Sequence, residues 1–456
     1  MTSFEYDVAI VGAGTAGCYA ASTISKAGYD VVIVERKDAE EAGHIACGDA
    51  LKGADEFPEA IPKSEIADAF TNTAVDHGRF EIPQEDAVLD IPVPGELAVI
   101  DRWEFGRQLI DAAERAGVDF HYDTVVQSVI QDDDGCVTGF EAKRAGKRRT
   151  YEATVTLDGA GALSILQDTI DFDGTTFDTN VRYSQFSSAY REIIEVEEPV
   201  EWDDALVVKP TKRSAGYLWY FPRTPTEINV GLGFQMNEEP MQLVRDLRED
   251  ISQRPELRGA TVKDKLGAAL PTRRPYDSAT APGYMAIGDA AAHVNPISGG
   301  GIGGAAYAGQ YAGEQAIQAL EDDDVTEKTL WRYNERVMDH YGGRYAALDV
   351  YNVFATAYDL DDLLSLLAAL PGEQLSDALY SGSSNVGLGL KLKVLYETVG
   401  HWGTLKNLYE TKGLADQLLS HYETYPSSPD GFDAWQAERD SIMDDIYAAT
   451  GAETKY

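Results

Sequence analysis

The first thirty-five residues constrain the fold of this chain more than any other segment. An apolar run at residues 6–11 leads into Gly12-Ala-Gly14-Thr-Ala-Gly17, and a segment rich in small residues follows. A second apolar run, residues 31–34, ends at Glu35. This order is typical of a buried strand, a glycine turn, a helix and a second, parallel strand. The sequence therefore predicts a βαβ unit at the N-terminus.

Each part of this pattern has a physical role in binding a dinucleotide. Gly12 allows a tight turn, Gly14 lets the backbone approach a pyrophosphate, and Gly17 lets the helix pack close to the strand. The helix N-terminus offers free N–H groups to phosphates. Glu35 comes 18 residues after Gly17, close to the roughly 20-residue spacing of a carboxylate that binds a ribose hydroxyl. We expect an adenine dinucleotide here; the alternative is a glycine turn without a ligand.

The size and charge of the chain narrow its class. A length of 456 residues predicts two or three domains. The 38 basic and 77 acidic residues give a net charge of −39, which disfavours binding to nucleic acid because a phosphate backbone would be repelled. The acidic residues recur along the whole chain. We interpret this surface as an adaptation to a salt-saturated cytoplasm, as in extremely halophilic archaea; the alternative is an ordinary acidic protein.

The cysteines and histidines predict no metal site and no disulfide framework. Cys18, Cys47 and Cys136 are too few and too scattered for either, and the seven histidines show no metal-ligand spacing. The N-terminus resembles no secretion signal, and no run of 18 uncharged apolar residues is present. These features lead us to expect a soluble, cytoplasmic protein.

A coarse secondary-structure prediction places the motifs on strands, helices and loops. We expect residues 38–80 to be loop-like and residues 180–235 to form an antiparallel sheet, because β-branched and aromatic residues alternate there with turn signals. The remaining expected elements are strands at 118–122, 125–129, 137–142, 151–157 and 283–287, helices at 102–116, 240–254 and 302–320, and a helical region at 331–456. An Asp-rich turn between 125–129 and 137–142 predicts that these two strands form a hairpin.

A second glycine motif follows a late strand. Gly288-Asp289 is followed by Pro296 and then by a glycine cluster that contains Gly301 at the start of a helix. The Asp289 carboxylate can accept a hydrogen bond from a ribityl hydroxyl, and the helix N-terminus can stabilise negative charge on a reduced flavin. Both motifs together suit an extended flavin dinucleotide better than a nicotinamide. The alternative is a loop that only allows close helix packing.

These residues resemble a known group of proteins. The first glycine motif with Glu35, Arg102 at a helix start, Asp158-Gly159 after a strand, and Gly288-Asp289 resemble the para-hydroxybenzoate hydroxylase superfamily of flavoproteins. Within it, Cys47-Gly48 and the segment Tyr217-Leu-Trp219-Tyr-Phe221-Pro222 resemble the geranylgeranyl reductases. The resemblance covers residues 1 to about 320. A second cysteine pair of that family has no counterpart, because no cysteine follows Cys136.

The resemblance implies a set of site residues. Cys47 would lie near the flavin ring and take part in catalysis, and Tyr217, Trp219, Phe221 and Pro222 would line the lipid site. FAD would contact Gly12, Gly14, Ala16, Gly17, Glu35, Cys47, Gly48, Ala50, Arg102, Val126 through its backbone, Asp289, Gly301 and Ile302.

Several of these residues also have simpler interpretations. Arg102 can pair with a pyrophosphate or form a surface salt bridge. Cys47 can approach a ring from its small-residue loop, or be a buried, inert cysteine. The alternating aromatic residues 217, 219 and 221 can form a plate for an isoprenoid chain or pack in an ordinary sheet core. The C-terminal tyrosines can likewise extend an apolar tunnel or pack in a core.

The resemblance also implies a fold. We expect an α/β protein with a Rossmann-type FAD-binding domain, an inserted antiparallel β-sheet substrate domain and a helical C-terminal region. The FAD-binding domain would be discontinuous and comprise residues 1–80, 99–172 and 266–330. The substrate domain would comprise residues 81–98 and 173–265, and the C-terminal region residues 331–456.

The implied function is reduction of C=C bonds in the geranylgeranyl chains of archaeal ether lipids. The electron donor would be NAD(P)H or ferredoxin, and the enzyme could contact the inner face of the membrane peripherally. A monooxygenase or halogenase of the same fold is one alternative, although the Trp-x-Trp-x-Ile-Pro pattern of halogenases is absent. An electron-transfer flavoprotein-type dehydrogenase is another, but three cysteines cannot hold a four-cysteine cluster. A flavin-binding protein without catalytic activity is the third. The proton donor is not identified by the sequence.

Overall fold

The N-terminal pattern forms the centre of the largest sheet. The computed structural model describes residues 2–54, 56–83, 86–93, 95–211, 216–236, 239–358 and 402–456. Strand β1 (Thr2–Val11) pairs in parallel with β2 (Val31–Val34), and helix α1 (Thr15–Lys26) connects them. The predicted βαβ unit is therefore confirmed. β2 and residues 8–11 of β1 are buried on both faces, as expected of a parallel sheet.

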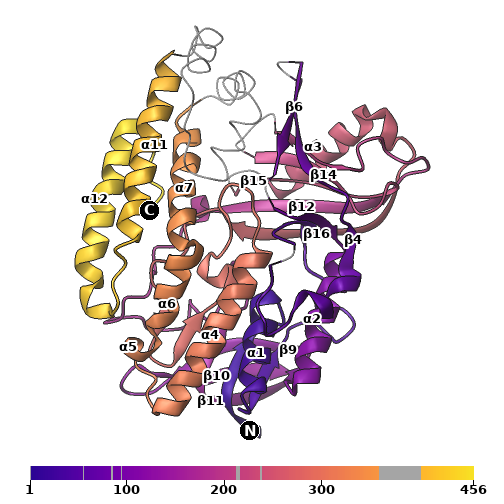
Figure 1. Ribbon diagram of the computed structural model, residues 1–456. Helices are drawn as coiled ribbons and strands as arrows, with labels where there is room; N and C mark the ends of the chain where they lie inside the picture. Colours follow the sequence, from indigo (N-terminus) through magenta and orange to yellow (C-terminus); the bar gives the residue numbers. More distant parts are fainter. Residues whose placement is uncertain are drawn as a thin grey trace.

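Eight strands make up this sheet, in the order β17-β18-β11-β1-β2-β8, with β10 and β9 added beside β11. Figure 1 labels β9, β10 and β11. β11 pairs in parallel with β1 and with β18, whereas β9 and β10 form the predicted antiparallel hairpin. Chain segments that lie far apart in sequence thus meet at adjacent strand ends. The bounds are β8 Asp119–His121, β9 Thr124–Gln131, β10 Val137–Arg144, β11 Lys147–Asp158, β17 Thr280–Ala281 and β18 Tyr284–Ala286.

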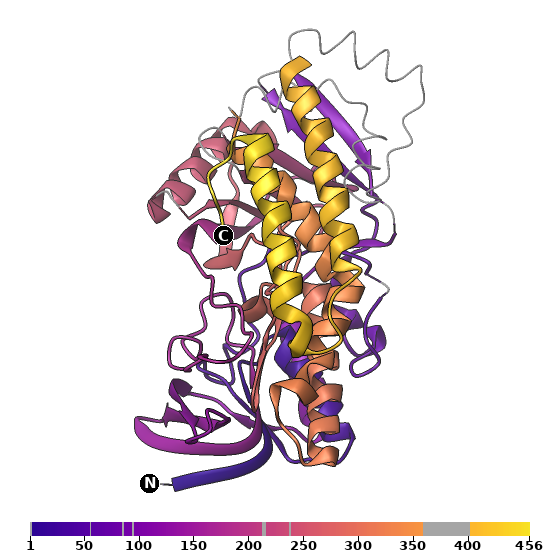
Figure 2. The same cartoon turned by 90° about the vertical axis from the view of Figure 1, so that its left-hand side faces the viewer.

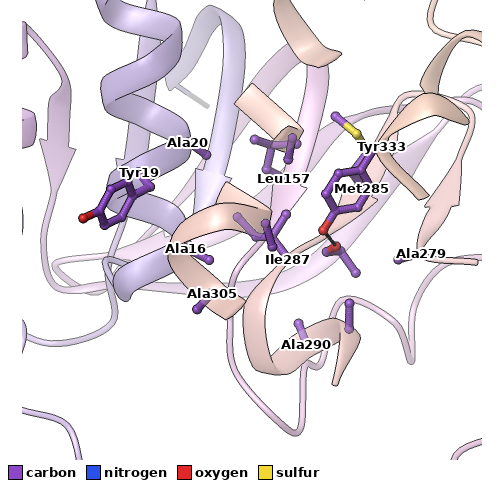
Figure 3. Packing of buried hydrophobic residues seen from close by; sticks show 14 of the residues in the cluster. Ala16, Tyr19, Ala20, Leu157, Ala279, Met285, Ile287, Ala290, Ala305 and Tyr333 are labelled. Carbon is purple, nitrogen blue, oxygen red and sulfur yellow. Dashed lines mark hydrogen bonds between the residues drawn. The ribbon is translucent and has the colours of Figure 1, made fainter. Parts of the chain in front are cut away.

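Two helices pack very closely on this sheet. A side chain at Gly309 or Gly313 in α4 (Ile302–Asp322) would collide with the backbone of α1 at Ala16 and Ala20. Figure 3 shows the small side chains of Ala16, Ala20 and Ala305 in the same core as Leu157 and Ile287. This packing holds the N-termini of α1 and α4 near the same edge of the sheet. Helix α2 (Arg102–Ala116) packs on α1.

A second, separate sheet contains seven strands, in the order β16-β12-β15-β14-β13-β5-β6. All neighbours are antiparallel except β13 and β5. Helix α3 (Pro240–Gln253), predicted at 240–254, covers one face through β12 and β15 (Figure 1). The strands are β5 His77–Ile82, β6 Ala87–Pro92, β12 Phe186–Glu195, β13 Ala205–Pro210, β14 Gly216–Pro222, β15 Glu227–Gln235 and β16 Thr261–Pro271.

This sheet is larger than the one expected from residues 180–235. β16, β5 and β6 also belong to it, so the expected boundaries at 80/81 and 265/266 fall inside β5 and β16. β16 and β6 are edge strands with many exposed positions. An exposed edge strand needs no apolar alternation, which explains why the sequence pattern missed them.

The expectation that residues 38–80 are loop-like was wrong in part. Three short strands, β3 (Ala50–Lys52), β7 (Leu97–Ile100) and β4 (Phe70–Asn72), form a small sheet in the order β3-β7-β4. Strands of three residues are too short to show a period. Short 3-10 helices lie at Lys63–Glu65, Ala67–Ala69, Tyr183–Gln185, Pro255–Leu257, Gly288–Ala291 and Pro429–Gly431.

The described part of the C-terminal region is helical, as predicted; residues 359–401 lie outside the described residues. Figure 2 shows the long helices running side by side along the molecule. Several tyrosines of this region pack in the core of the larger sheet, among them Tyr333, Tyr341 and Tyr422, which favours the core interpretation of these residues. The helices are α5 Glu327–Leu330, α6 Arg332–Val337, α7 Gly343–Thr356, α11 Trp402–Tyr422 and α12 Phe432–Thr450, with a π-helical turn at Met338–Gly342.

Among the described helices, none combines the length and the apolar character needed to cross a lipid bilayer.

Candidate functional site

The first glycine loop, residues 12–17, lies between β1 and α1 and contains one open position. Gly12 has a φ of +97°, and a side chain there would collide with the carbonyl of Gly159. A side chain at Gly17 would collide with the carbonyl of Gly12. At Gly14, by contrast, an added Cβ meets no atom within 4 Å. Gly14 is also the N-cap of α1 and supplies no side-chain cap. The free N–H groups of this helix end can therefore be approached closely by a phosphate.

Glu35 lies beside this loop at the end of β2. Its carboxylate accepts hydrogen bonds from the N–H of Ala13 at 3.0 Å and of Lys37 at 2.9 Å. The backbone of Thr124 donates to the Glu35 carbonyl at 2.9 Å, which places the start of β9 and the buried Val126 next to Glu35. Two predicted dinucleotide contacts therefore lie on the same side of the first glycine loop.

Arg102 is the first residue of α2 and is almost completely buried. The α2 N-terminus is capped by Asp101, whose side chain accepts from Trp103 N and Glu104 N. The Arg102 Nη2 donates to Thr15 Oγ1 at 3.3 Å, whereas Nη1 has no hydrogen-bond partner among the described residues. A buried guanidinium with a spare donor at the α1 N-terminus is suited to an anion such as pyrophosphate, and its burial argues against a surface salt bridge.

The second glycine loop, residues 288–301, joins β18 to α4. Gly301 is the N-cap of α4 without a side-chain cap, and Ile302 is the first helical residue. An added Cβ on Gly301 would lie 3.5 Å from Asp289 Oδ1. Burial raises the pKa of the Asp289 carboxyl to about 6, and the positive charge of Arg102 opposes this shift. Because the pKa of Asp289 lies below 7, its carboxyl is largely ionised at neutral pH. The positive charge of Arg102 thus acts on both glycine loops.

The aromatic plate consists of Tyr217, Trp219 and Phe221, which lie on one face of β14. Their rings follow one another, with centroids 6.0 Å and 6.4 Å apart, while Leu218 and Tyr220 pack in the core on the opposite face. The alternation predicted from the sequence is therefore present. The Tyr217 hydroxyl donates to the carbonyl of Ser298 in the second glycine loop at 2.6 Å, and Pro222 ends the strand.

The Cys47-Gly48 pair lies against this plate. An added Cβ on Gly48 would lie 3.3 Å from the Phe221 ring and 3.4 Å from Trp219 Nε1. Burial raises the pKa of the Cys47 thiol and the nearby Asp49 carboxylate raises it further, so the thiol is protonated at neutral pH. Ala50 follows directly in β3. The plate thus contacts both the Cys47-Gly48 loop and the second glycine loop.

Sequence reasoning missed four buried polar residues at this site: Thr15, Asp49, Arg223 and Asn229. Asn229 interrupts the buried apolar run of β15, and its carboxamide contacts both Cys47 and Trp219. Arg223 pairs with the fully buried Asp49 at 2.7 Å. A polar residue within an apolar strand was a signal that could have pointed to Asn229. Nothing local marks Arg223, because its partner lies 174 positions away.

The residues therefore fit an extended dinucleotide. The open Gly14 and the uncapped N-termini of α1 and α4 follow β1 and β18, the two strands that flank β11 in one sheet. Arg102, with its spare donor, contacts Thr15 at the α1 N-terminus. Such an arrangement is typical of dinucleotide sites in α/β folds. Within the described residues, no group of three or more His, Cys, Asp or Glu side chains could hold a metal ion.

Comparison with known proteins gives a family match. A family model described as an FAD binding domain matches residues 5–341. The chain is 26% identical to the digeranylgeranylglycerophospholipid reductase of Sulfolobus acidocaldarius over 97% of this chain and 98% of that protein. It is 29% identical to the protein of the same name from Methanothrix thermoacetophila, over 86% of this chain and 98% of the relative.

Solved structures share the fold. A geranylgeranyl bacteriochlorophyll reductase-like protein from Thermoplasma acidophilum superposes with a TM-score of 0.70 at 22% identity, covering 90% of this chain and all of that one. The flavin-dependent brominase Bmp2 gives a TM-score of 0.61 at 18% identity, covering 83% of this chain and 98% of that one.

Proposed function

The chain belongs to the FAD binding domain family, and on this premise we propose that it is an FAD-dependent reductase that saturates C=C bonds in the geranylgeranyl chains of archaeal ether lipids. The observation that carries the proposal is the contact between the aromatic plate and the Cys47-Gly48 loop. Through Tyr217 and Ser298, this apolar surface also contacts the second glycine loop. Similarity along nearly the whole chain to reductases of digeranylgeranylglycerophospholipids supports the same substrate class.

Each end of the proposed FAD site has its own residues. The α1 N-terminus and Arg102 would hold the pyrophosphate, and Glu35 would hold the adenosine ribose. Asp289 would accept from the ribityl chain, and the α4 N-terminus at Gly301 would face the ring. Bound and reduced, FAD would supply a hydride to one alkene carbon, and the other carbon would take up a proton.

The protein's own contribution would be positioning and exclusion of water. An isolated alkene has no charged group to which a side chain could bind. Its orientation therefore has to come from the shape of the site and from apolar contacts. Trp219 and Phe221 are 6% and 8% exposed because they pack with Val75, Leu97 and Val99, so water has little access to these two rings. The Cys47 thiol, kept protonated by its surroundings, is the titratable group that borders the plate from the loop side.

The electron donor and the membrane complete the proposal. We infer that NAD(P)H or ferredoxin reduces the flavin and that the enzyme meets its lipid at the inner face of the membrane as a peripheral protein. An anionic lipid surface would repel a chain of net charge −39 at low salt. At molar salt the Debye length falls to about 3 Å, which removes most of this repulsion.

Anaerobic turnover tests the function directly. Chemically reduced enzyme is mixed with an unsaturated ether lipid, flavin reoxidation is followed by absorbance, and the lipid is analysed by mass spectrometry. The proposal expects reoxidation together with a gain of two mass units per saturated bond, because each bond takes up two hydrogens. If the flavin is reoxidised only in the presence of oxygen, and halide becomes incorporated into an aromatic substrate, the result would instead support a halogenase. That is the second candidate, because the brominase shares the fold.

A further inference from the structure

Asn229 connects the two halves of the proposed substrate site through one carboxamide. Its Nδ2 donates to the carbonyl of Cys47 at 2.8 Å, and its Oδ1 accepts from Trp219 Nε1 at 2.8 Å. The side chain is fully buried. Its neighbours in β15, Ile228 and Val230, point to the opposite face and pack in the core under α3. Asn229 is thus a polar residue placed under the aromatic plate.

Two glycines on the same face of β15 make room for the indole of Trp219. A side chain at Gly231 would collide with the Trp219 ring, so the ring lies directly on the Gly231 backbone. An added Cβ on Gly233 would lie 3.9 Å from the same ring. The flat side of the indole is therefore supported by two glycines, and its N–H edge is held by Asn229. Together these contacts determine both the position and the rotation of the ring.

A second bridge holds the other end of the Cys47 loop. Arg223, directly after β14, pairs with Asp49 Oδ2 at 2.7 Å. Asp49 has a φ of +70°, in the left-handed region, which Asp adopts more readily than most non-glycine residues. The segment from Cys47 to Asp49 is therefore attached at two points to the β14–β15 pair.

We propose that Asn229 is a positioning residue that sets the orientation of Trp219 relative to the Cys47-Gly48 backbone, and so the pose of the isoprenoid chain at the reacting alkene. The inference rests on the proposed function of the site. Stability alone gives a weak reason for such a residue, because a buried polar group mainly offsets its own desolvation cost. Its two hydrogen bonds instead join β14, through Trp219, to the Cys47-Gly48 loop. An isoprenoid substrate has no polar groups along its length, so the relative position of these two elements would decide how it is held.

Three variants of the full-length protein, prepared with FAD, test the proposal. Asn229→Leu removes both hydrogen bonds. Asn229→Asp keeps the acceptor for Trp219 and can donate to Cys47 only while its new carboxyl is protonated. Asn334→Leu is the matched control, since Asn334 is equally buried and makes several hydrogen bonds, but these tie α6 to the Ser278–Thr280 segment. All three are compared with the unaltered protein for FAD content, lipid-dependent reoxidation and the ¹⁵N-indole NMR signal of Trp219.

The proposal expects the Asn229→Leu variant to retain FAD. Its maximal reoxidation rate should fall about ten- to a hundredfold, the range that misplacement of about 1 Å can produce. Its apparent lipid affinity should change less than this rate. The Trp219 indole N–H should shift upfield and exchange faster with solvent, while the signal of Trp202, buried across the sheet, stays in place. Asn334→Leu should lower the unfolding temperature but leave the Trp219 signal and the reoxidation rate per bound FAD unchanged.

Asn229→Asp should produce a new pH dependence. At low pH the protonated carboxyl can replace both bonds, so the rate should approach that of the unaltered protein, and it should fall as the carboxyl ionises. The ionisable groups around this position are Cys47, Asp49 with its partner Arg223, and Arg191 on β12. They are present in the unaltered protein too, so the difference between the two pH profiles isolates the new group.

Two results would overturn the inference. One is a Trp219 indole signal in Asn229→Leu that matches the unaltered protein in shift and exchange. The other is a reoxidation rate per bound FAD that is the same in the two proteins. If Asn229→Leu fails to fold, the pH profile and indole signal of Asn229→Asp decide the question. If the unaltered enzyme is itself not reoxidised by the lipid, the proposed function fails, whereas the indole signal still decides whether Asn229 orients Trp219.

Discussion

Gly14 and Gly17 are three residues apart in one loop, yet the structure places opposite constraints on them. Gly17 lies against the carbonyl of Gly12, so its lack of a side chain is required for the fold. Gly14 faces open space, so nothing in the protein itself requires a glycine there. A glycine without a structural reason, at an uncapped helix N-terminus, is best explained by a ligand that approaches the backbone.

Alanine substitutions should separate these two roles. Gly14→Ala should change the free energy of unfolding of the FAD-free protein by no more than about 1 kcal/mol and weaken FAD binding at least tenfold, because the methyl group occupies the space of the phosphate. Gly17→Ala should destabilise the FAD-free protein by about 1–3 kcal/mol. Denaturant unfolding and FAD titration by fluorescence measure both quantities. Unchanged FAD affinity in Gly14→Ala would remove the pyrophosphate from this loop.

His293 makes the stability of the protein sensitive to acid. Its side chain is buried against Tyr333 and Tyr341, and neither ring nitrogen has a hydrogen-bond partner among the described residues. Burial lowers the pKa of His293 from 6.5 to about 3. Between these two values the unfolded chain binds a proton that the folded chain does not. Stability from this group is therefore complete above pH 6.5 and is lost as the pH falls toward 3.

His293→Phe should remove that loss. Relative to the variant, the unaltered protein should lose up to about 1.4 kcal/mol of unfolding free energy per pH unit below pH 6.5. The pKa of Asp289 is shifted upward, so this group acts in the opposite direction from about pH 4 to 6. It is present in both proteins and cancels in the comparison. Denaturant unfolding at constant salt from pH 7 to 4.5 provides the test, and parallel pH curves would refute the assignment.

At the scale of elements, the two faces of β14 have different surroundings. One face carries the aromatic plate toward the Cys47-Gly48 loop, and the other packs Leu218 and Tyr220 into the core under α3. The strand lies between β13 and β15 in the sheet, so its backbone is held on both sides. A rigid central strand is a suitable support for a site that works by positioning.

Matched truncations on the two faces should therefore differ in function. Trp219→Ala and Leu218→Ala each remove a buried side chain, at a cost of about 2–5 kcal/mol in stability. Only Trp219→Ala should slow lipid-dependent reoxidation, by on the order of a hundredfold, and both should retain FAD. Stopped-flow absorbance at equal FAD occupancy measures the rates. Joint loss of FAD and activity in Trp219→Ala would indicate a structural aromatic residue, and an unaltered rate would exclude the plate from the substrate site.

At the scale of the whole molecule, charge dominates the behaviour in solution. A net charge of −39 on 456 residues produces strong self-repulsion unless salt screens it. In the described part of the chain many basic residues form ion pairs, several of them buried, such as Arg273 with Asp178 and Lys455 with Asp349. The unbalanced acidic charge is thus left for the surface, which is the basis of the proposed halophilic adaptation.

A salt series should reveal this adaptation. When salt falls from molar concentration to about 0.1 M, the Debye length grows from about 3 Å to about 10 Å and more like charges interact. The unfolding temperature should fall steadily over this range, with FAD content held constant. Thermal unfolding followed by circular dichroism measures it. An unfolding temperature independent of salt would show that the acidic surface is not an adaptation to a saline cytoplasm.

The sequence pattern was enough to predict those elements that are stabilised by contacts between residues close in sequence. The βαβ unit, the helix at α2, the hairpin of β9 and β10, and the alternation of residues 217, 219 and 221 all follow from periodicity and glycine spacing. These features depend on neighbours within a few turns or strand lengths. The glycine loops also showed which kind of ligand to expect, because their geometry is set by consecutive residues.

Contacts between distant segments were decided only by the tertiary structure. The edge strands β6 and β16 join the second sheet without an apolar period, because exposed edges do not need one. Asn229 meets a carbonyl 182 residues away, and Arg223 meets a carboxylate 174 residues away. No sequence pattern links such partners, since their pairing arises from how two sheets pack. The sequence alone determined the cofactor loops and the aromatic plate, whereas tertiary packing decided how the plate is oriented against Cys47.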